Sequence, residues 1–167
     1  MTLRLKCRNG ARTLVGVAAL TARAALAATP ARAQALTATE AGVGGMLALA
    51  HRSFWGPELV VARRPGTQGR FAFTVAGGDN EGALGVRVAA DAQLLLRPAE
   101  RVGLGPYGGL GLAFVGAAGA RGAGYLTLAV GVEAAPGRRQ GWYAELGLGG
   151  GVRLSLGRRF RRFPSWW

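Results

Sequence analysis

Within residues 141–160, residues 142–157 alternate strictly between two kinds of residue, and this constrains the fold more than any other feature of the sequence. Every second residue from Trp142 to Leu156 is apolar or glycine, whereas the residues between them are polar or very small. Because side chains alternate between two faces along a β-strand, this period of two predicts one long strand with an apolar face and a polar, glycine-rich face. A helix would need apolar residues at a spacing of 3.6, and each internal glycine would cost it about 1 kcal/mol.

The length of this run favours a strand that crosses a membrane. Strands of soluble proteins usually have about 5–6 residues, whereas a tilted strand that spans a bilayer needs roughly 9–11. A transmembrane β-barrel turns its apolar face to lipid and its small or polar face inward. The sequence therefore predicts that residues 141–160 lie in the wall of such a barrel.

Six further strand-like runs precede this stretch, and short glycine- and proline-rich turns separate them. The second run alternates poorly, because Leu59, Val60 and Val61 are consecutive. The even spacing of runs and turns predicts an all-β fold, a small antiparallel up-and-down transmembrane β-barrel of about eight strands. The six runs cover residues 39–50, 56–64, 69–77, 83–96, 104–116 and 121–134.

The strand count leaves one question open. Seven runs are visible, whereas transmembrane barrels of this kind have an even number of strands. Either a strand is hidden within residues 36–64, or the last run contains a turn at residues 149–151, which are all glycine. The unbroken alternation argues against that turn.

Residues 1–35 have the layout of a secretory signal peptide. Four positive charges lie within residues 1–12, an alanine-rich apolar segment follows, and two small-x-small sequences end at Ala33 and Ala35. We predict export with cleavage after one of these two alanines. Arg23 interrupts the apolar segment, so an amphipathic helix that stays attached is the alternative. The single cysteine, Cys7, would leave with the leader, and we expect no disulfide in the mature chain.

The formal net charge of +13 is, taken alone, typical of a nucleic-acid binder. However, six of the 21 basic residues belong to the leader, whereas all eight acidic residues follow it. The mature chain would keep 15 basic and 8 acidic residues, a net charge of +7. We therefore predict no nucleic-acid partner.

With this leader, these alternating strands and a final strand GVRLSLGRRF that ends in Phe160, the chain resembles the small outer-membrane β-barrel proteins of Gram-negative bacteria. The resemblance implies an outer-membrane location, a barrel over residues 36–160, a monomeric state and a basic, aromatic tail over residues 161–167. It also implies that the assembly machinery reads a terminal aromatic residue. Both Phe160 and Trp167 could serve.

The inward parity of the better strands carries three positive and three negative side chains. A narrow barrel is filled by side chains, and buried charges must pair because desolvation costs several kcal/mol per ion. We interpret these residues as a structural network of ion pairs; the alternative is a narrow path for ions or small solutes. The six residues are Arg70, Arg87, Asp91, Glu133, Glu145 and Arg153.

Arginines gather in alternate turns of the expected barrel. If the last run is one strand that ends in the periplasm, the turns at residues 64–69, 97–104 and 135–141 face outward. Guanidinium groups suit phosphate groups, so we hypothesise that this rim contacts lipopolysaccharide; the alternative is a set of solvated turns. The rim residues are Arg63, Arg64, Arg97, Arg101, Arg138 and Arg139.

The tail combines arginines with aromatic residues, which is typical of an anchor at the membrane interface. We expect Phe160, Phe163, Trp166 and Trp167 to form this anchor. Stacking on nucleic-acid bases is the alternative for such a composition.

Three other interpretations stay open from the sequence. His51, Ser53 and Glu58 could serve a lipid A esterase on the lipid-facing wall. Residues 102–120 carry no charge and could be a transmembrane helix, although Pro106 and seven glycines disfavour it. The apolar faces could also form the core of a secreted β-sandwich. Because no phosphate loop, metal-binding motif or cofactor motif is present, we expect a non-enzymatic, structural or envelope-related role without cofactor or metal.

Overall fold

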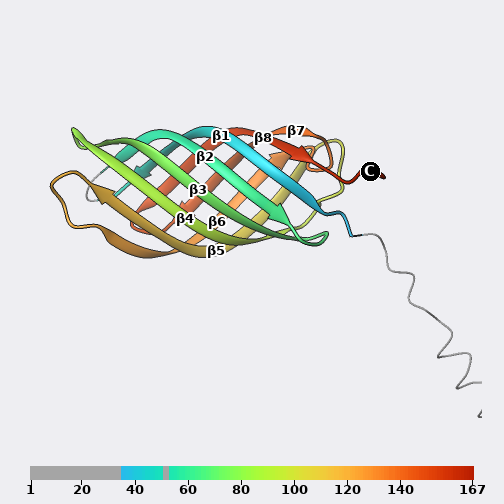
Figure 1. The fold of residues 1–167 in the computed structure, drawn as a ribbon, viewed down its shortest axis with the longest axis horizontal. Coiled ribbons are helices and arrows are strands. Elements are labelled where there is room, and N and C mark those ends of the chain that lie inside the picture. The colour runs from blue at the N-terminus through green and yellow to red at the C-terminus, as the bar shows by residue number, and fades with distance from the viewer. Residues whose placement is uncertain (1–34, 51–52) are drawn as a thin grey trace, which may run out of the picture. The chain divides into compact units, whose positions relative to one another are not determined.

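The computed structural model describes residues 35–50 and 53–167, which form eight antiparallel strands in a closed barrel (Figure 1). Each strand pairs with the next along the chain, and β1 pairs with β8 to close the barrel. The strands are β1 (Ala38–Leu49), β2 (Phe54–Arg64), β3 (Gly69–Asn80), β4 (Ala83–Leu95), β5 (Leu104–Ala117), β6 (Ala123–Ala134), β7 (Gln140–Leu148) and β8 (Val152–Arg162).

Closure confirms the predicted fold class and removes two of the alternatives. Because β1 and β8 are paired over eleven positions, the sheet has no free edge, and the strand backbones pair within the wall. A sandwich would instead bury its apolar faces between two sheets. The uncharged segment at residues 102–120 contains β5, and among residues 35–50 and 53–167 no helix is long and apolar enough to cross a membrane.

The stretch predicted as one long strand is a hairpin of β7 and β8. Leu148 pairs with Val152, and the three glycines between them form the turn. All three have positive φ, with Gly150 at 71°, a backbone region that glycine adopts without steric cost. A turn of three residues keeps the parity of the alternation, because its flanking residues are four apart and face the same side. The parity argument against this turn was therefore wrong, and the turn supplies the eighth strand.

The weakly alternating second run is nevertheless a regular strand. In β2 the side chains alternate strictly between buried and exposed, with Leu59 62% exposed, Val60 5% and Val61 58%. Val60 faces the interior, where it packs with Ala62 and Ala72 in a small apolar cluster. An inward valine interrupts the polar inner face of the barrel, which is why the sequence pattern is unclear here.

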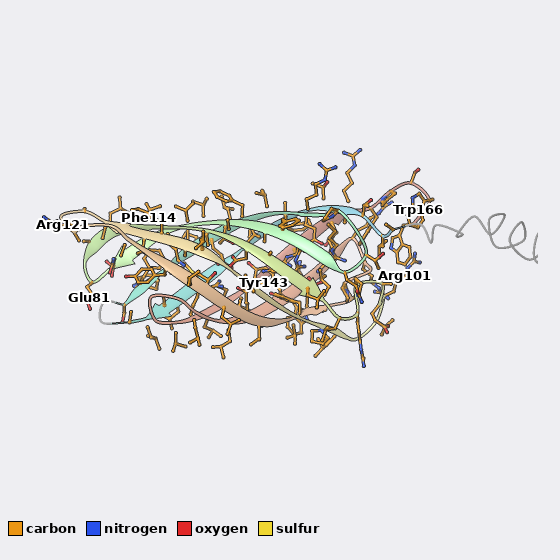
Figure 2. All side chains as sticks on the ribbon, turned by 90° about the horizontal axis from the view of Figure 1, so that it is seen from below. Glu81, Arg101, Phe114, Arg121, Tyr143 and Trp166 are labelled. Atoms are coloured by element: carbon orange, nitrogen blue, oxygen red, sulfur yellow. The ribbon has the colours of Figure 1, made fainter. Side chains whose placement is uncertain are left out.

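Large apolar side chains cover the outside of the barrel, here called the outer wall (Figure 2). They come from all eight strands and lie on the parity opposite to the buried charged residues. Examples from the strands are Val43, Leu59, Phe73, Val86, Leu94, Leu110, Phe114, Leu128, Val130, Leu146, Leu154 and Leu156.

The barrel has two ends that differ in their connections. The turns β2–β3, β4–β5 and β6–β7 lie at the end where β1 begins and β8 ends, which we call the termini end. The turns β3–β4, β5–β6 and β7–β8 lie at the opposite end. Figure 2 shows Arg101 and Trp166 at the termini end and Glu81 and Arg121 at the opposite end.

Candidate functional site

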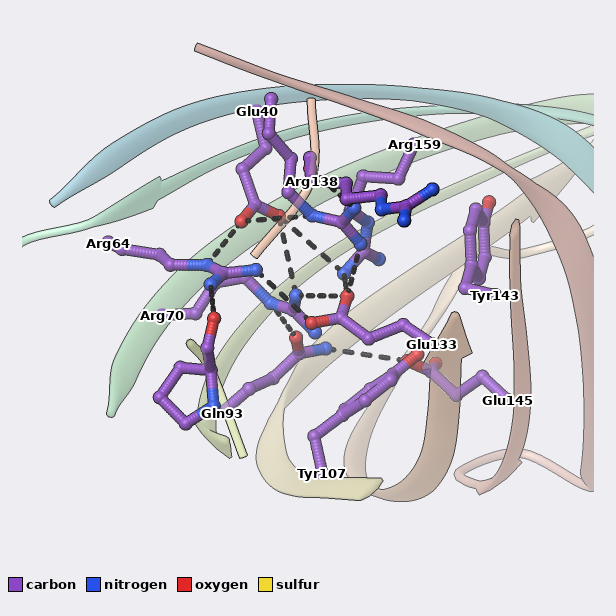
Figure 3. A network of polar contacts seen from close by, with 12 residues as sticks. Glu40, Arg64, Arg70, Gln93, Tyr107, Glu133, Arg138, Tyr143, Glu145 and Arg159 are labelled. Atoms are coloured by element: carbon purple, nitrogen blue, oxygen red, sulfur yellow. Dashed lines mark hydrogen bonds and ion pairs between the residues drawn. The ribbon is translucent and has the colours of Figure 1, made fainter. Parts of the chain in front are cut away.

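Two glutamates and four arginines form a buried cluster inside the half of the barrel near the termini end (Figure 3). Glu133 on β6 accepts contacts from all four arginines, at 3.1 Å from Arg64, 2.9 Å from Arg70, 3.2 Å from Arg159 and 2.8 Å from Arg161. Glu40 on β1 pairs with the same four groups, most closely with Arg64 and at 3.3 Å with Arg70. We call these six residues the ion cluster.

The ion cluster carries a formal surplus of two positive charges. Other acceptors share this surplus: Arg64 donates to the carbonyl of Pro98 at 3.3 Å, and Arg70 donates to the Gln93 side chain at 2.7 Å. The guanidinium of Arg159 lies 4.6 Å from the centre of the Tyr143 ring, a cation–π contact. Such contacts offset part of the desolvation cost, which amounts to several kcal/mol per buried ion.

The other buried charges form a second layer toward the opposite end. Glu145 pairs with Arg153 and accepts a hydrogen bond of 3.0 Å from the hydroxyl of Tyr107. Glu58 accepts hydrogen bonds from Tyr143 at 2.6 Å and from Ser155 at 3.1 Å.

Asp91 completes this layer. Its carboxylate accepts a hydrogen bond of 2.6 Å from Thr127. Each carboxylate of the second layer thus has at least one hydrogen-bond donor. The network joins strands that are not neighbours in the sheet, such as β2 and β7.

All six residues predicted for the interior are buried, but they do not form one site. Arg70 and Glu133 belong to the ion cluster, while Glu145 and Arg153 form the pair of the second layer. Asp91 bonds to Thr127, and Arg87 makes no ion pair within 4 Å in the described part of the chain. The six residues are Arg70, Arg87, Asp91, Glu133, Glu145 and Arg153.

Several residues of the network were not predicted from the sequence. Glu40 lies on the inward parity of β1, and Glu58 lies on that of β2, where the alternation was unclear. Arg159 and Arg161 continue the inward parity of Arg153 in β8. Their parity continues the alternation, but the alternation in the sequence was followed only as far as residue 157.

The predicted rim of arginines lies at the termini end, and one of its members belongs elsewhere. Arg64 is fully buried in the ion cluster and is not a rim residue. The outward orientation of the rim rested on an uninterrupted last strand. With the β7–β8 hairpin included, the same topology rule places the termini end in the periplasm, so this argument for lipopolysaccharide contact fails. The exposed members are Arg63, Arg97, Arg101, Arg138 and Arg139, and Arg158 and Arg162 of β8 are exposed at the same end.

The aromatic tail folds back onto the turns of the termini end. Trp167 donates its indole N–H to the carbonyl of Gly137 at 3.0 Å, and Arg101 lies over its ring at 4.5 Å. Phe163 packs against Trp167, whereas Trp166 and Phe160 are exposed. Of the four predicted anchor residues, two are therefore open to a membrane interface and two pack within the tail.

A hollow in the outer wall adjoins the exposed arginines of the termini end. It is an open, mostly apolar groove of about 840 Å³ that runs over several strands near the termini end. The residues that line it include the apolar Ala41, Phe71 and Phe160 and the charged Arg63 and Arg162. We call it the wall groove.

Glu58, one of the residues of the esterase interpretation, does not lie on the outer wall. His51 lies outside the described residues. Ser53 precedes β2, while Glu58 points into the barrel, where Tyr143 and Ser155 use its carboxylate. Within residues 35–50 and 53–167 no group of three histidine, cysteine or acidic side chains is placed to hold a metal ion.

Comparison with known proteins supports the fold. No protein-family model matches the sequence, and no curated protein matches it significantly. Among solved structures, the chain is similar to the N-terminal β-barrel domain of Pseudomonas aeruginosa OprF, with 16% identity and a TM-score of 0.59 over 75% of this chain and 97% of that one. It is also similar to Neisserial surface protein A, with 18% identity and a TM-score of 0.53 over 74% of this chain and 96% of that one. At these identities the likeness concerns the barrel fold.

Proposed function

We propose that this chain is a monomeric barrel of the bacterial outer membrane with a structural, non-enzymatic role in the cell envelope. The observation that carries the proposal is the apolar outer wall, which surrounds an interior that contains buried ion pairs. In water such a wall would expose far more apolar surface than a soluble monomer tolerates. In a bilayer the same wall is matched by lipid tails, and closure satisfies the strand backbones without water.

Within this role, the exposed arginines at the termini end bind phosphate groups of membrane lipids. Arg63 and Arg162 border the wall groove, so a phosphate held by them would place an acyl chain against Phe71 and Phe160. Guanidinium groups bind phosphate oxygens through paired hydrogen bonds. Since the corrected strand count favours a periplasmic termini end, the lipid would be a phospholipid of the inner leaflet, such as phosphatidylglycerol.

The orientation can be tested with single cysteines, because Cys7 is the only cysteine in the sequence. In a Cys7→Ser background, Ala118→Cys at the opposite end and Ala99→Cys at the termini end are treated with an impermeant maleimide on intact cells. We expect label on the first variant alone, with the second becoming labelled after the outer membrane is permeabilised. The reverse pattern would place the termini end, with its exposed arginines, on the lipopolysaccharide side of the membrane.

Lipid binding is tested separately from orientation. The variant Arg63→Gln/Arg139→Gln/Arg162→Gln is compared with Arg121→Gln, which removes an exposed arginine from the opposite end. Spin-labelled lipids in reconstituted bilayers report which headgroups stay next to the barrel. We expect only the triple variant to lose its preference for phosphatidylglycerol over phosphatidylcholine. Retained preference would refute lipid binding by these residues, and loss of lipopolysaccharide binding alone would identify that lipid as the ligand.

Membrane insertion is tested by fractionation and by gel mobility. We expect the protein in the outer-membrane fraction, with a faster band before boiling than after it, because a closed barrel resists detergent until it is heated. A protein found free in the periplasm with no mobility shift would refute the proposal. Phe160, which is exposed near the end of β8, is the better candidate for recognition by the assembly machinery. Trp167 is instead held by contacts with Arg101 and Gly137.

A further inference from the structure

Arg87 differs from the other buried arginines of the barrel. In the part of the chain that the structure describes, six arginines are buried, and five of them have a carboxylate oxygen within 4 Å. Arg87 has none, although it is only 4% exposed. Its Nη1 donates to the carbonyl of Gly149 at 3.3 Å, and its Nη2 has no partner among the described residues. A buried charge without a counter-ion is costly.

The carboxylates deeper in the barrel are engaged by other groups. Asp91, the next acidic residue along β4, accepts its hydrogen bond from Thr127. Glu145 pairs with Arg153, and Glu58 bonds to Tyr143 and Ser155. These carboxylates therefore leave the side of the Arg87 guanidinium that faces the opposite end of the barrel available to a ligand.

A pocket of about 670 Å³ opens above Arg87 at the opposite end of the barrel, and we call it the mouth pocket. Inward-facing side chains of several strands line it, including Phe54 and Val115, which make it partly apolar. Asn80 adds a second buried polar group whose side-chain oxygen has no partner among the described residues. Exposed Arg121 also lines the pocket near its entrance.

The charges around the entrance are compatible with an anion. Glu81 lies exposed on the β3–β4 turn. The carboxylate of Asp79 accepts hydrogen bonds from the backbone N–H of Gly82, at 3.0 and 3.2 Å, and so belongs to that turn. Neither residue lines the pocket, whereas both Arg87 and Arg121 do.

We propose that the mouth pocket binds a small organic carboxylate. Its carboxylate group pairs with Arg87 and accepts a hydrogen bond from the Asn80 amide, whose oxygen and nitrogen positions are interchangeable. Its apolar body lies against Phe54 and Val115. Such a combination of a few polar groups with apolar walls is typical of small-molecule pockets, and planar carboxylates match the guanidinium geometry.

The experiment uses the mature barrel in phosphatidylcholine nanodiscs and sodium benzoate as the probe. Arginine side chains labelled with ¹⁵N are followed by NMR, and the Arg87 signal is assigned with the Arg87→Lys variant. We expect the Arg87 signal to shift and saturate, and Arg87→Gln to weaken benzoate binding at least about tenfold. Arg158→Gln, which removes an exposed arginine from the outer wall, is the matched control and should bind as the unaltered chain does. Empty nanodiscs correct for partitioning of benzoate into lipid.

Three outcomes would overturn the proposal. An Arg87 signal that does not move up to the solubility limit of benzoate would mean that water alone serves this guanidinium. Equal binding of benzyl alcohol, the neutral analogue, would mean that the pocket selects apolar bulk without charge. Equal binding of inorganic phosphate would mean that it selects charge without an apolar body. The first measurement needs only the unaltered chain and the charge-conserving Arg87→Lys variant that assigns the signal, so it decides the matter even if Arg87→Gln fails to fold.

Discussion

Replacing Glu133 by glutamine should destabilise the barrel more than any other single loss of a carboxylate. The side chain is 1% exposed and lies within 3.2 Å of four guanidinium groups. The change would raise the formal charge of the ion cluster from +2 to +3 and leave Glu40 as its only carboxylate. Glutamine is almost isosteric with glutamate, so the packing of the neighbouring side chains is kept and the effect reports on charge.

The size of the effect follows from two opposing contributions. At an effective dielectric constant of about 20, unit charges separated by 4 Å attract by about 4 kcal/mol, and Glu133 makes several such contacts. Against this stand its repulsion from Glu40 and its own desolvation, which costs several kcal/mol. Loss of one partner from a buried ion pair typically costs about 3–5 kcal/mol. Because the glutamine oxygen can still accept a hydrogen bond, we expect a loss near the lower value, about 3 kcal/mol.

The assay is reversible urea unfolding of the barrel in phosphatidylcholine vesicles, followed by tryptophan fluorescence and by gel mobility. Coincidence of the two transitions justifies a two-state free energy. Glu100→Gln, on the exposed β4–β5 turn, is the control and should change stability by less than about 0.5 kcal/mol. The double variant Glu133→Gln/Arg161→Gln restores the cluster charge to +2 and should recover part of the loss. A loss below about 1 kcal/mol for Glu133→Gln would refute the view that the cluster depends on this carboxylate.

Three further predictions use the same unfolding assay. Tyr143→Phe removes the 2.6 Å hydrogen bond to Glu58 and should cost about 1–3 kcal/mol. Tyr125→Phe, whose hydroxyl makes no hydrogen bond among the described residues, should cost almost nothing. Equal losses for the two variants would contradict the role of the Glu58 bond. Gly150→Val should cost at least about 1–2 kcal/mol, because the φ of 71° at Gly150 disfavours a side chain and a Cβ there would lie 2.8 Å from the Tyr125 ring. An unchanged midpoint of urea unfolding would show that the turn relaxes freely. Leu110→Arg places a charge in the middle of the outer wall and should cost about 2–4 kcal/mol in a bilayer; a smaller loss would mean that this position does not face the lipid core.

The strand pattern of the sequence is enough to predict the barrel, but not its topology in full. Alternation depends only on neighbouring residues, so it identifies the two faces of each strand correctly, including the inward position of Arg70 and Glu133. A three-residue turn leaves the alternation intact, so the alternation alone does not reveal the hairpin at Gly150. That single turn decides which end of the barrel each connection occupies. Backbone preference was the better signal, since three consecutive glycines weaken a strand and suit a tight turn.

The partners of the buried charges depend on information that the sequence pattern does not contain. Glu133 on β6 contacts Arg70 on β3 and Arg64 on β2, which are not its neighbours in the sheet. These contacts cross the lumen, so they are set by the stagger and tilt of the strands around the barrel. Parity predicts that such side chains point inward, but only the closed structure determines which of them meet. The contact of Trp167 with Arg101 is equally non-local, because the tail must fold back across two turns.

The glycines of the inner face follow from the size of the side chains opposite them. A Cβ at Gly157 would lie 2.7 Å from the hydroxyl of Tyr143, and one at Gly131 would lie 2.6 Å from that of Tyr107. Both tyrosines reach across the interior to a carboxylate, Tyr143 to Glu58 and Tyr107 to Glu145. The very small residues noticed in the sequence therefore leave room for the two long side chains that complete the second layer.

The distribution of charge along the barrel links the interior to the proposed lipid contact. The ion cluster, with its surplus of two positive charges, lies in the same half as the exposed arginines, whereas the opposite end carries Glu81 together with Arg121. Positive charge inside the wall adds to the potential that phosphate groups meet outside it, and the low dielectric of the surrounding lipid weakens screening. Phosphate binding at one end would also fix the depth of the barrel in the bilayer. The buried surplus would thus support the proposed lipid contact of the exposed arginines, and neutralising the cluster should weaken lipid selectivity even where no exposed residue is changed.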